Sequence, residues 1–136
     1  LLSAQHYKSL KERLYDEGIT VAKLDRFSTA KEKRDVLTGL ADGSIDVVVG
    51  THALLKAKFK NLALVVIDEE HKFGVKQKEA LKEMSIDVHL LSMSATPIPR
   101  SLNMALSEVK SFSEILTPPT ERQGVRTFVK SYDEKV

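Results

Sequence analysis

The 136-residue chain has no cysteine, which excludes disulfides, iron–sulfur clusters and thiolate zinc sites. It has no apolar run near the roughly 20 residues of a membrane-spanning helix, and its N-terminus lacks the basic and then apolar segments of a signal peptide. Its charge is nearly balanced, with 21 lysines and arginines against 19 aspartates and glutamates, so any contact with nucleic acid must be local. These absences predict a cytoplasmic protein with no membrane partner.

Hydrophobic residues make up 42% of the chain, enough to bury the core of one ordinary domain. Their spacing alternates between helical periods and short continuous β-branched runs, which predicts an α/β fold. The runs at residues 45–49, 62–67 and 88–93 are too continuous for half-exposed strands. We therefore expect them inside a parallel sheet that helices cover on both faces.

Capping signals place the helices between these runs. Thr29 and Glu32 have the spacing of a capping box, and the helix that they open is expected to stop near Gly43. A short strand is expected at 21–24. Further helices are expected around 7–14, ending at Gly18, at 75–84 and, with a clear amphipathic pattern, at 98–110.

A linker is expected at Thr117-Pro118-Pro119-Thr120, because proline continues neither a helix nor a central strand. Val125–Val129 then alternates like the start of another strand. The chain begins with Leu1 rather than methionine, so we expect a piece of a longer protein. Residues 1–117 would form one partial domain, and 118–136 would form a linker and the start of the next.

Three of the predicted strands end in residues that can carry chemistry. Ligands of open α/β sheets collect at the carboxyl ends of the strands. Asp68 at such an end can hold Mg²⁺ through its water shell, and Glu69 can orient or deprotonate a water for attack on a γ-phosphate. The three ends read Gly50-Thr51-His52, Asp68-Glu69-Glu70-His71 and Ser94-Ala95-Thr96.

These strand ends also have simpler interpretations. The acids are compatible with a solvated loop that caps the next helix, because acidic residues are common at helix starts. Ser94 and Thr96 taken alone favour a helix cap. Their place beside Asp68 favours instead hydroxyls that hydrogen-bond His71 and sense the phosphate.

Other parts of the pattern are weaker or missing. His52 by itself is more typical of a loop histidine than of a nucleic-acid contact, and Lys56, Lys58 and Lys60 favour a solvated basic loop over a phosphate-binding edge. No glycine is followed by lysine, so the phosphate-cradling Gly-x-x-x-x-Gly-Lys-Ser/Thr loop is absent from these residues. The chain therefore carries half of a nucleotide site.

In this order, the strand ends resemble the first RecA-like motor domain of superfamily 2 helicases and DNA translocases. Residues 49–55, 67–75 and 94–102 are similar to the branch that contains the transcription-repair coupling factors and the RecG helicases, both of which are double-stranded DNA translocases. RecG helicases more typically show Asp-Glu-Gln-His. The stretches closer to the coupling factors are Arg26-Phe27 with Ala30-Lys31-Glu32, Asp68–His71, Lys78–Lys82, and Thr117–Pro119 with Val125–Val129.

The resemblance implies an ATP- and Mg²⁺-dependent translocase on double-stranded DNA that displaces stalled RNA polymerase in transcription-coupled repair. RNA polymerase and repair proteins would bind through other domains. Asp68 would hold Mg²⁺, Glu69 would activate water, and His71 would link the nucleotide to Ser94 and Thr96, which couple hydrolysis to domain movement. The residues implied to lie near the DNA phosphate backbone are Gln5, His6, Arg26, Thr51, His52 and Arg100.

The resemblance also implies that residues 1–117 run from motif Ia through motif III, with the Walker A loop upstream of Leu1. Its strand would lie between those that end at Asp68 and Ser94. We therefore expect these two strands to pair directly, or exposed edges and apolar surface to be covered by self-association. Nucleotide affinity and activity of residues 1–136 alone are expected to be negligible.

Three alternatives stay open. The first is a RecG-type branched-DNA helicase. The second is a non-enzymatic signalling domain of the response-regulator type, with Asp68 as phosphoacceptor and Thr96 and Lys110 as switch partners. Such a domain needs a pair of acids at an earlier strand end, where Asp25 is followed by the basic Arg26. The third is a module that only binds DNA or protein.

Overall fold

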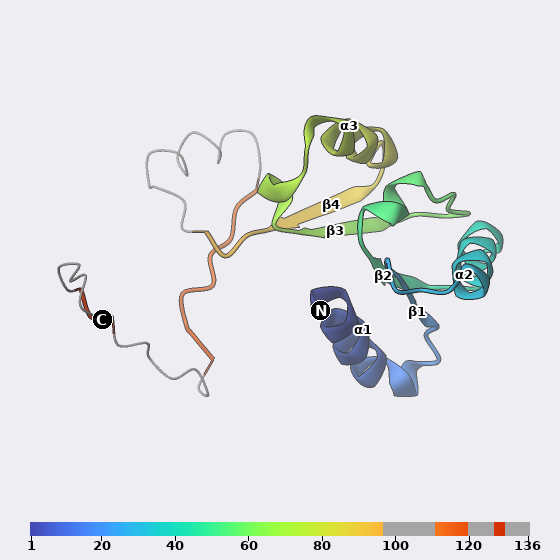
Figure 1. Ribbon diagram of the computed structural model, residues 1–136, viewed down its shortest axis with the longest axis horizontal. Helices are drawn as coiled ribbons and strands as arrows, with labels where there is room; N and C mark the ends of the chain where they lie inside the picture. Colours follow the sequence, from blue (N-terminus) through green and yellow to red (C-terminus); the bar gives the residue numbers. More distant parts are fainter. Residues whose placement is uncertain (97–110, 120–126, 130–136) are drawn as a thin grey trace, which may run out of the picture. The chain divides into compact units, whose positions relative to one another are not determined.

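The computed structural model describes residues 1–96, 111–119 and 127–129. Leu1–Thr96 form one compact unit, and Pro97–Val136 form a second. All described helices and strands lie in the first unit (Figure 1). In the second unit, the described residues are in neither helix nor strand, and the helix expected at 98–110 lies outside the described residues.

The first unit alternates helices and strands, as the apolar spacing predicts. Its core residues are Leu24, Leu40, Ile67 and Leu81. None of the described helices is both long enough and apolar enough to cross a membrane. In chain order the elements are α1 (Leu2–Arg13), η1 (Tyr15–Glu17), β1 (Val21–Leu24), α2 (Ala30–Asp42), β2 (Val47–Gly50), η2 (His52–Lys56), β3 (Leu64–Asp68), η3 (Glu70–Lys72), α3 (Val75–Met84) and β4 (His89–Met93).

The strands form two parallel pairs. In one pair β1 lies beside β2, with Leu24 opposite Gly50, and in the other β3 lies beside β4, with Asp68 opposite Met93. The α/β class and the parallel direction are confirmed. The direct pairing of β3 with β4 is the first of the two outcomes expected for these strands, and the described strands form two two-stranded sheets rather than one.

Burial of the strands differs from the prediction. Both α1 and α2 pack against β1, and α1 also packs against β2, whose four residues are all half-buried. The expected burial on both faces is wrong for residues 62–67 and 88–93, since Leu64 and Val66 of β3 are 56% and 50% exposed and all five residues of β4 are exposed. The reason is that the described helices pack mainly against other elements, α1 and α2 against β1 and α3 against η2.

The helix ends follow the predicted capping chemistry. The Thr29 hydroxyl accepts a hydrogen bond from the Glu32 amide at 3.2 Å, and the Glu32 carboxylate accepts one from the Thr29 amide at 2.7 Å. This capping box satisfies amide groups that the first turn of a helix leaves without a partner. Gly43 ends α2 with a positive φ of 83°, a conformation that glycine adopts without a steric penalty.

Thr29→Ala is expected to lower the free energy of unfolding by about 1 kcal/mol, because the capping hydroxyl is lost. Chemical denaturation measures this change. Thr38→Ala is the matched control, since Thr38 is exposed in the interior of α2 and its substitution should change stability by at most about 0.5 kcal/mol. Equal losses in the two variants would contradict a stabilising role for the cap.

Candidate functional site

The site residues lie where the parallel strands end. Because Leu24 pairs with Gly50, the segments that follow β1 and β2 leave the same edge, and the same holds for the segments that follow β3 and β4. Gly50 allows close approach of the first pair, because a Cβ there would collide with the Leu24 carbonyl oxygen and the Leu54 side chain. The sequence prediction that polar residues gather at these ends is consistent with this geometry.

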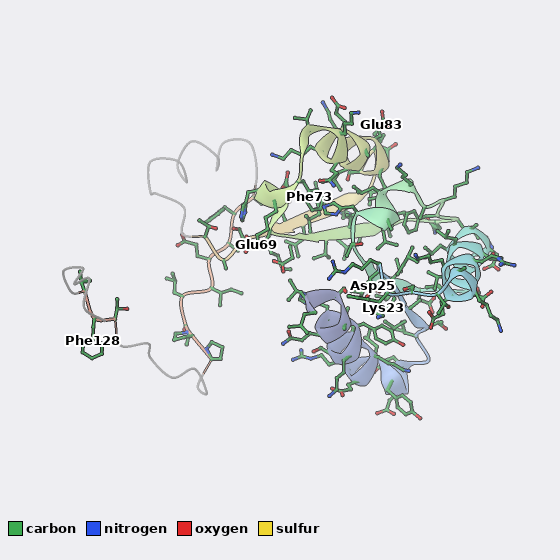
Figure 2. The ribbon with its side chains drawn as sticks, in the orientation of Figure 1. Lys23, Asp25, Glu69, Phe73, Glu83 and Phe128 are labelled. Atoms are coloured by element: carbon green, nitrogen blue, oxygen red, sulfur yellow. The ribbon has the colours of Figure 1, made fainter. Side chains whose placement is uncertain are left out.

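Glu69 bridges the ends of β3 and β4. Its amide donates to the carbonyl of Met93 at 2.9 Å, and its Oε1 accepts from the amide of Ala95, also at 2.9 Å. Its Oε2 lies 3.1 Å from Nδ1 of His71. The side chain is only 17% exposed, and the residue has a φ of 58°, which is uncommon outside glycine. The carboxylate is therefore held in one place from two sides. Figure 2 labels Glu69 at the end of β3.

His71 makes a different contact from the one expected. It lies against Glu69, and the hydrogen bond from His71 to Ser94 or Thr96 is not formed. Instead, Ser94 Oγ accepts from the Thr96 amide at 3.1 Å, a local contact typical of serine in turns. The physical reason is that the Glu69 carboxylate already links His71 to the end of β4. The roles of Ser94 and Thr96 in coupling remain predictions.

Glu70 has a partner that the sequence did not indicate. Ser92 Oγ donates to Glu70 Oε2 at 2.7 Å, which adds a second link between β4 and the acids that follow β3. The two adjacent glutamates thus have different partners. Glu69 contacts a backbone amide and a histidine, and Glu70 contacts a serine hydroxyl.

Asp68 is the acid to which the sequence assigns Mg²⁺. Its side chain is 35% exposed, and Oδ2 lies 3.6 Å from Nε2 of His6 in α1. No cluster of three metal-ligating side chains occurs among the described residues. A single partly exposed carboxylate nevertheless fits Mg²⁺, which proteins often hold through one or two carboxylates while phosphates and waters complete the shell.

The residues implied to contact DNA lie in several elements. Gln5 and His6 are on α1, Arg26 follows β1, and Thr51 and His52 follow β2. The Arg26 guanidinium lies 4.6 Å from the centre of the Phe27 ring, which is 69% exposed. The His52 ring lies 5.0 Å from that of Phe73, inclined by 54°. Arg100 lies outside the described residues, as does Lys110 of the signalling alternative.

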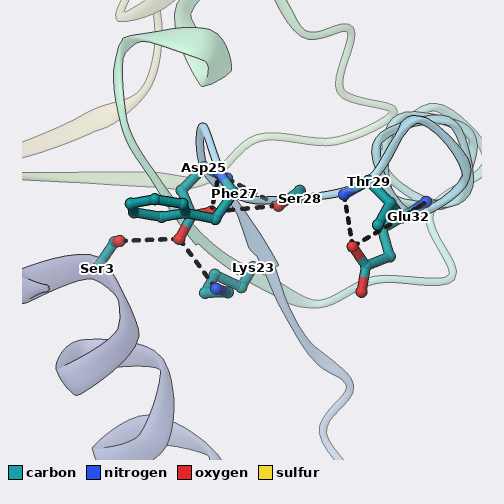
Figure 3. Close-up of polar contacts among 7 residues, drawn as sticks. All are labelled: Ser3, Lys23, Asp25, Phe27, Ser28, Thr29 and Glu32. Atoms are coloured by element: carbon teal, nitrogen blue, oxygen red, sulfur yellow. Dashed lines mark hydrogen bonds and ion pairs between the residues drawn. The ribbon is translucent and has the colours of Figure 1, made fainter.

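A buried carboxylate organises the turn after β1 (Figure 3). Asp25 is 4% exposed, and its Oδ2 contacts Lys23 Nζ at 2.9 Å and accepts from Ser3 Oγ at 3.2 Å. Its Oδ1 accepts from the Phe27 amide at 3.0 Å and from Ser28 Oγ at 3.4 Å. The Lys23 hydrogen bond, with help from the Phe27 amide, outweighs burial and lowers the pKa of Asp25 to about 2.

Sequence reasoning considered Asp25 only for the signalling alternative and gave Phe73 no role in the site. A signal for Asp25 was present, because aspartate followed by serine three residues later is typical of a turn closed by side-chain hydrogen bonds. The contact between His52 and Phe73 had no local signal, since 21 positions in the chain separate the two residues.

Comparison with known proteins agrees with this geometry. The family model described as DEAD/DEAH box helicase matches residues 1–105. The chain belongs to the DEAD/DEAH box helicase family. It is 57% identical, over all of its 136 residues, to the transcription-repair-coupling factor of Helicobacter pylori (strain J99), and 46% identical to that of Escherichia coli K12.

These relatives are much longer, since the chain spans 14% and 12% of their lengths. A solved structure described as RecG bound to a three-way DNA junction is 45% identical, with a TM-score of 0.61, and covers 79% of this chain and 14% of that one. Both families named from the sequence motifs are thus among the relatives of this helicase-family chain. The finding confirms the resemblance and the RecA-like character of the fold.

The low pKa of Asp25 predicts how stability depends on pH. The folded-state pKa lies below the ordinary value of 3.8, so the contribution of the carboxylate to stability is complete above about pH 3.8 and is lost as the pH falls through about 2. A carboxyl ¹³C NMR titration should place the midpoint of Asp25 near 2, and Lys23→Met should raise it toward 3.8. An unchanged midpoint in that variant would show that Lys23 is not the main cause.

Proposed function

We propose that this chain belongs to the first motor domain of an ATP-dependent double-stranded DNA translocase that acts in transcription-coupled repair and displaces stalled RNA polymerase. The supporting relatives are those named transcription-repair-coupling factor. The single observation that carries the chemical part of the proposal is the Glu69 carboxylate, held between the Ala95 amide and His71 directly after Asp68. A fixed carboxylate beside an acid that can hold Mg²⁺ is an arrangement suited to hydrolysis of a γ-phosphate.

The two acids divide the work. Asp68 would hold Mg²⁺, which neutralises charge on the phosphates of ATP when bound. Glu69 accepts a hydrogen bond from the attacking water and takes its proton. Its contact with Ala95 fixes the carboxylate relative to β4, and its contact with His71 keeps a second polar group beside the carboxylate as it gains the proton.

DNA contacts complete the proposal. The carboxyl ends of β1 and β2 share one edge, and just beyond it lie Arg26, Thr51 and His52. The first turns of α1 contain Gln5 and His6. Contacts from these residues and from Arg100 to phosphate would position the strand without reading its sequence, which suits a motor that runs on any DNA. In this proposal RNA polymerase and repair proteins bind through other domains, and the protein acts in the cytoplasm, where bacterial DNA lies.

The domain assignment follows from the same proposal. Residues 1–117 belong to the first motor domain, and residues 118–136 form the connection to the second motor domain and its first strand. A RecG-type branched-DNA helicase is the second candidate, favoured by the structural likeness to RecG. Relatives named transcription-repair-coupling factor that match the whole chain at 43–57% identity favour the coupling-factor function over it.

Glu69→Gln in the full-length protein is expected to keep ATP binding and to lower the turnover number by about 10²-fold or more, because the proton acceptor is lost. Steady-state hydrolysis and nucleotide titration measure the two effects. Glu70→Gln is the matched control, in which the turnover number should stay near the wild-type value. Glutamine keeps an oxygen that can accept the Ser92 hydrogen bond. Near-normal hydrolysis by the Glu69 variant would overturn the assignment.

Arg26→Ala is expected to weaken DNA binding about equally for all sequences. It should also reduce the slope of log Kd against log salt concentration by about the amount that one phosphate contact contributes. Arg34→Ala is a control, because Arg34 is an exposed arginine on α2 that the proposal does not assign to DNA. Binding to duplexes of two unrelated sequences over a salt series gives the slopes. The same slope in wild type and Arg26→Ala would show that Arg26 makes no contact with a DNA phosphate.

A further inference from the structure

Two of the histidines assigned to DNA lie against the segment that holds the hydrolytic acids. This acid segment consists of residues 68–73. Nε2 of His6 lies 3.6 Å from Oδ2 of Asp68, and the ring of His52 packs on that of Phe73 at 5.0 Å. The elements proposed to contact DNA and the elements proposed to hydrolyse ATP therefore touch through side chains.

Phe73 is tied to Glu69 through the backbone. The amide of Lys72 donates to the carbonyl of Glu69 at 2.9 Å, and the amide of Phe73 donates to that of Glu70 at 3.0 Å. These bonds close the short helical turn that separates the ring from the bridging carboxylate. A displacement of Phe73 therefore acts on the backbone that fixes Glu69.

Backbone hydrogen bonds also hold the residue that precedes His52. The amide of Thr51 donates to the carbonyl of Leu24 at 3.3 Å, and the carbonyl of Thr51 accepts from Leu54 at 3.0 Å. The helix η2 that begins at His52 also packs against α3, which starts two residues after Phe73. A movement of η2 toward a phosphate is therefore transmitted to the acid segment through the rings of His52 and Phe73 and through α3.

We infer that Phe73 is a positioning residue that couples contact between His52 and a DNA phosphate to the placement of the Glu69 carboxylate. The inference rests on the proposed function, because it needs both a DNA site and an ATP site. Coupling between two sites requires a physical contact that each ligand biases, and the His52–Phe73 pair supplies it. Phe73 itself would touch neither ligand.

Reciprocity of coupling provides the test. If DNA tightens the binding of ATP by some factor, then ATP tightens the binding of DNA by the same factor. In the full-length protein, Kd for duplex DNA is measured without nucleotide and with a saturating non-hydrolysable ATP analogue, and Kd for the analogue is measured without DNA and with saturating DNA. Phe73→Leu, which keeps an apolar side chain but removes the ring, is expected to lower both ratios by the same factor, about 5-fold or more.

Three variants separate coupling from packing. Phe73→Tyr keeps the ring, so both affinity ratios are expected to stay within about 2-fold of the wild-type values. Phe59→Leu is the matched control, because Phe59 is a half-buried phenylalanine outside the acid segment, and it should leave both ratios unchanged. His52→Leu combined with Phe73→Leu should lose no more coupling than Phe73→Leu alone, because both changes remove one contact.

The outcomes distinguish this inference from the function on which it rests. If the wild-type protein shows DNA-stimulated hydrolysis while Phe73→Leu keeps both affinity ratios, the inference is wrong and the function stands. If the wild-type protein hydrolyses no ATP with or without DNA, the function itself fails. Should Phe73→Leu unfold, as circular dichroism would show, His52→Leu decides through the ratio of Kd for the analogue without DNA to Kd with saturating DNA, and a wild-type value of that ratio contradicts the coupling.

Discussion

The hydrogen bond from the Ala95 amide to the Glu69 carboxylate depends on the parallel pairing of β3 with β4. The register of this pair sets Asp68 opposite Met93. Only a parallel pair brings both carboxyl ends to one edge, where the end of one strand can donate to a side chain from the other. A shift of this register by one residue would turn Ser92 away from Glu70 and would remove the second link as well.

A carboxylate also links neighbouring segments at the end of the other pair of strands, β1 and β2. Asp25 is buried, and a buried charge is costly unless it is paired and hydrogen-bonded. Lys23 and Ser3 satisfy one carboxylate oxygen, and the following turn satisfies the other. The satisfied acid fixes the turn that displays Arg26 and Phe27. Here the carboxylate is structural and 4% exposed, whereas the Glu69 side chain keeps 17% of its surface exposed.

The sequence predicts whatever short-range chemistry determines. The Thr29 capping box follows from spacing alone, and the acids at the end of β3 follow from an apolar run followed by a polar one. The left-handed backbone of Glu69 has no such signal in the local sequence. The partner of His71 is only two residues away, but the order of the strand ends favoured the hydroxyls of Ser94 and Thr96 instead. The exposure of β4 depends on which elements cover it, which a single strand's composition does not specify.

The polar ends of the two strand pairs meet on one face of α1. Ser3 and His6 are three residues apart and so share a face of the helix, and they contact Asp25 and Asp68 respectively. Because α1 has no fully buried residue, apolar burial holds this helix only weakly, and polar contacts gain weight in setting its position. Under the proposed function, a DNA phosphate bound by Gln5 or His6 would pull on a helix that is linked to both strand-end acids, Asp25 beside Arg26 and Asp68, which is proposed to hold the metal.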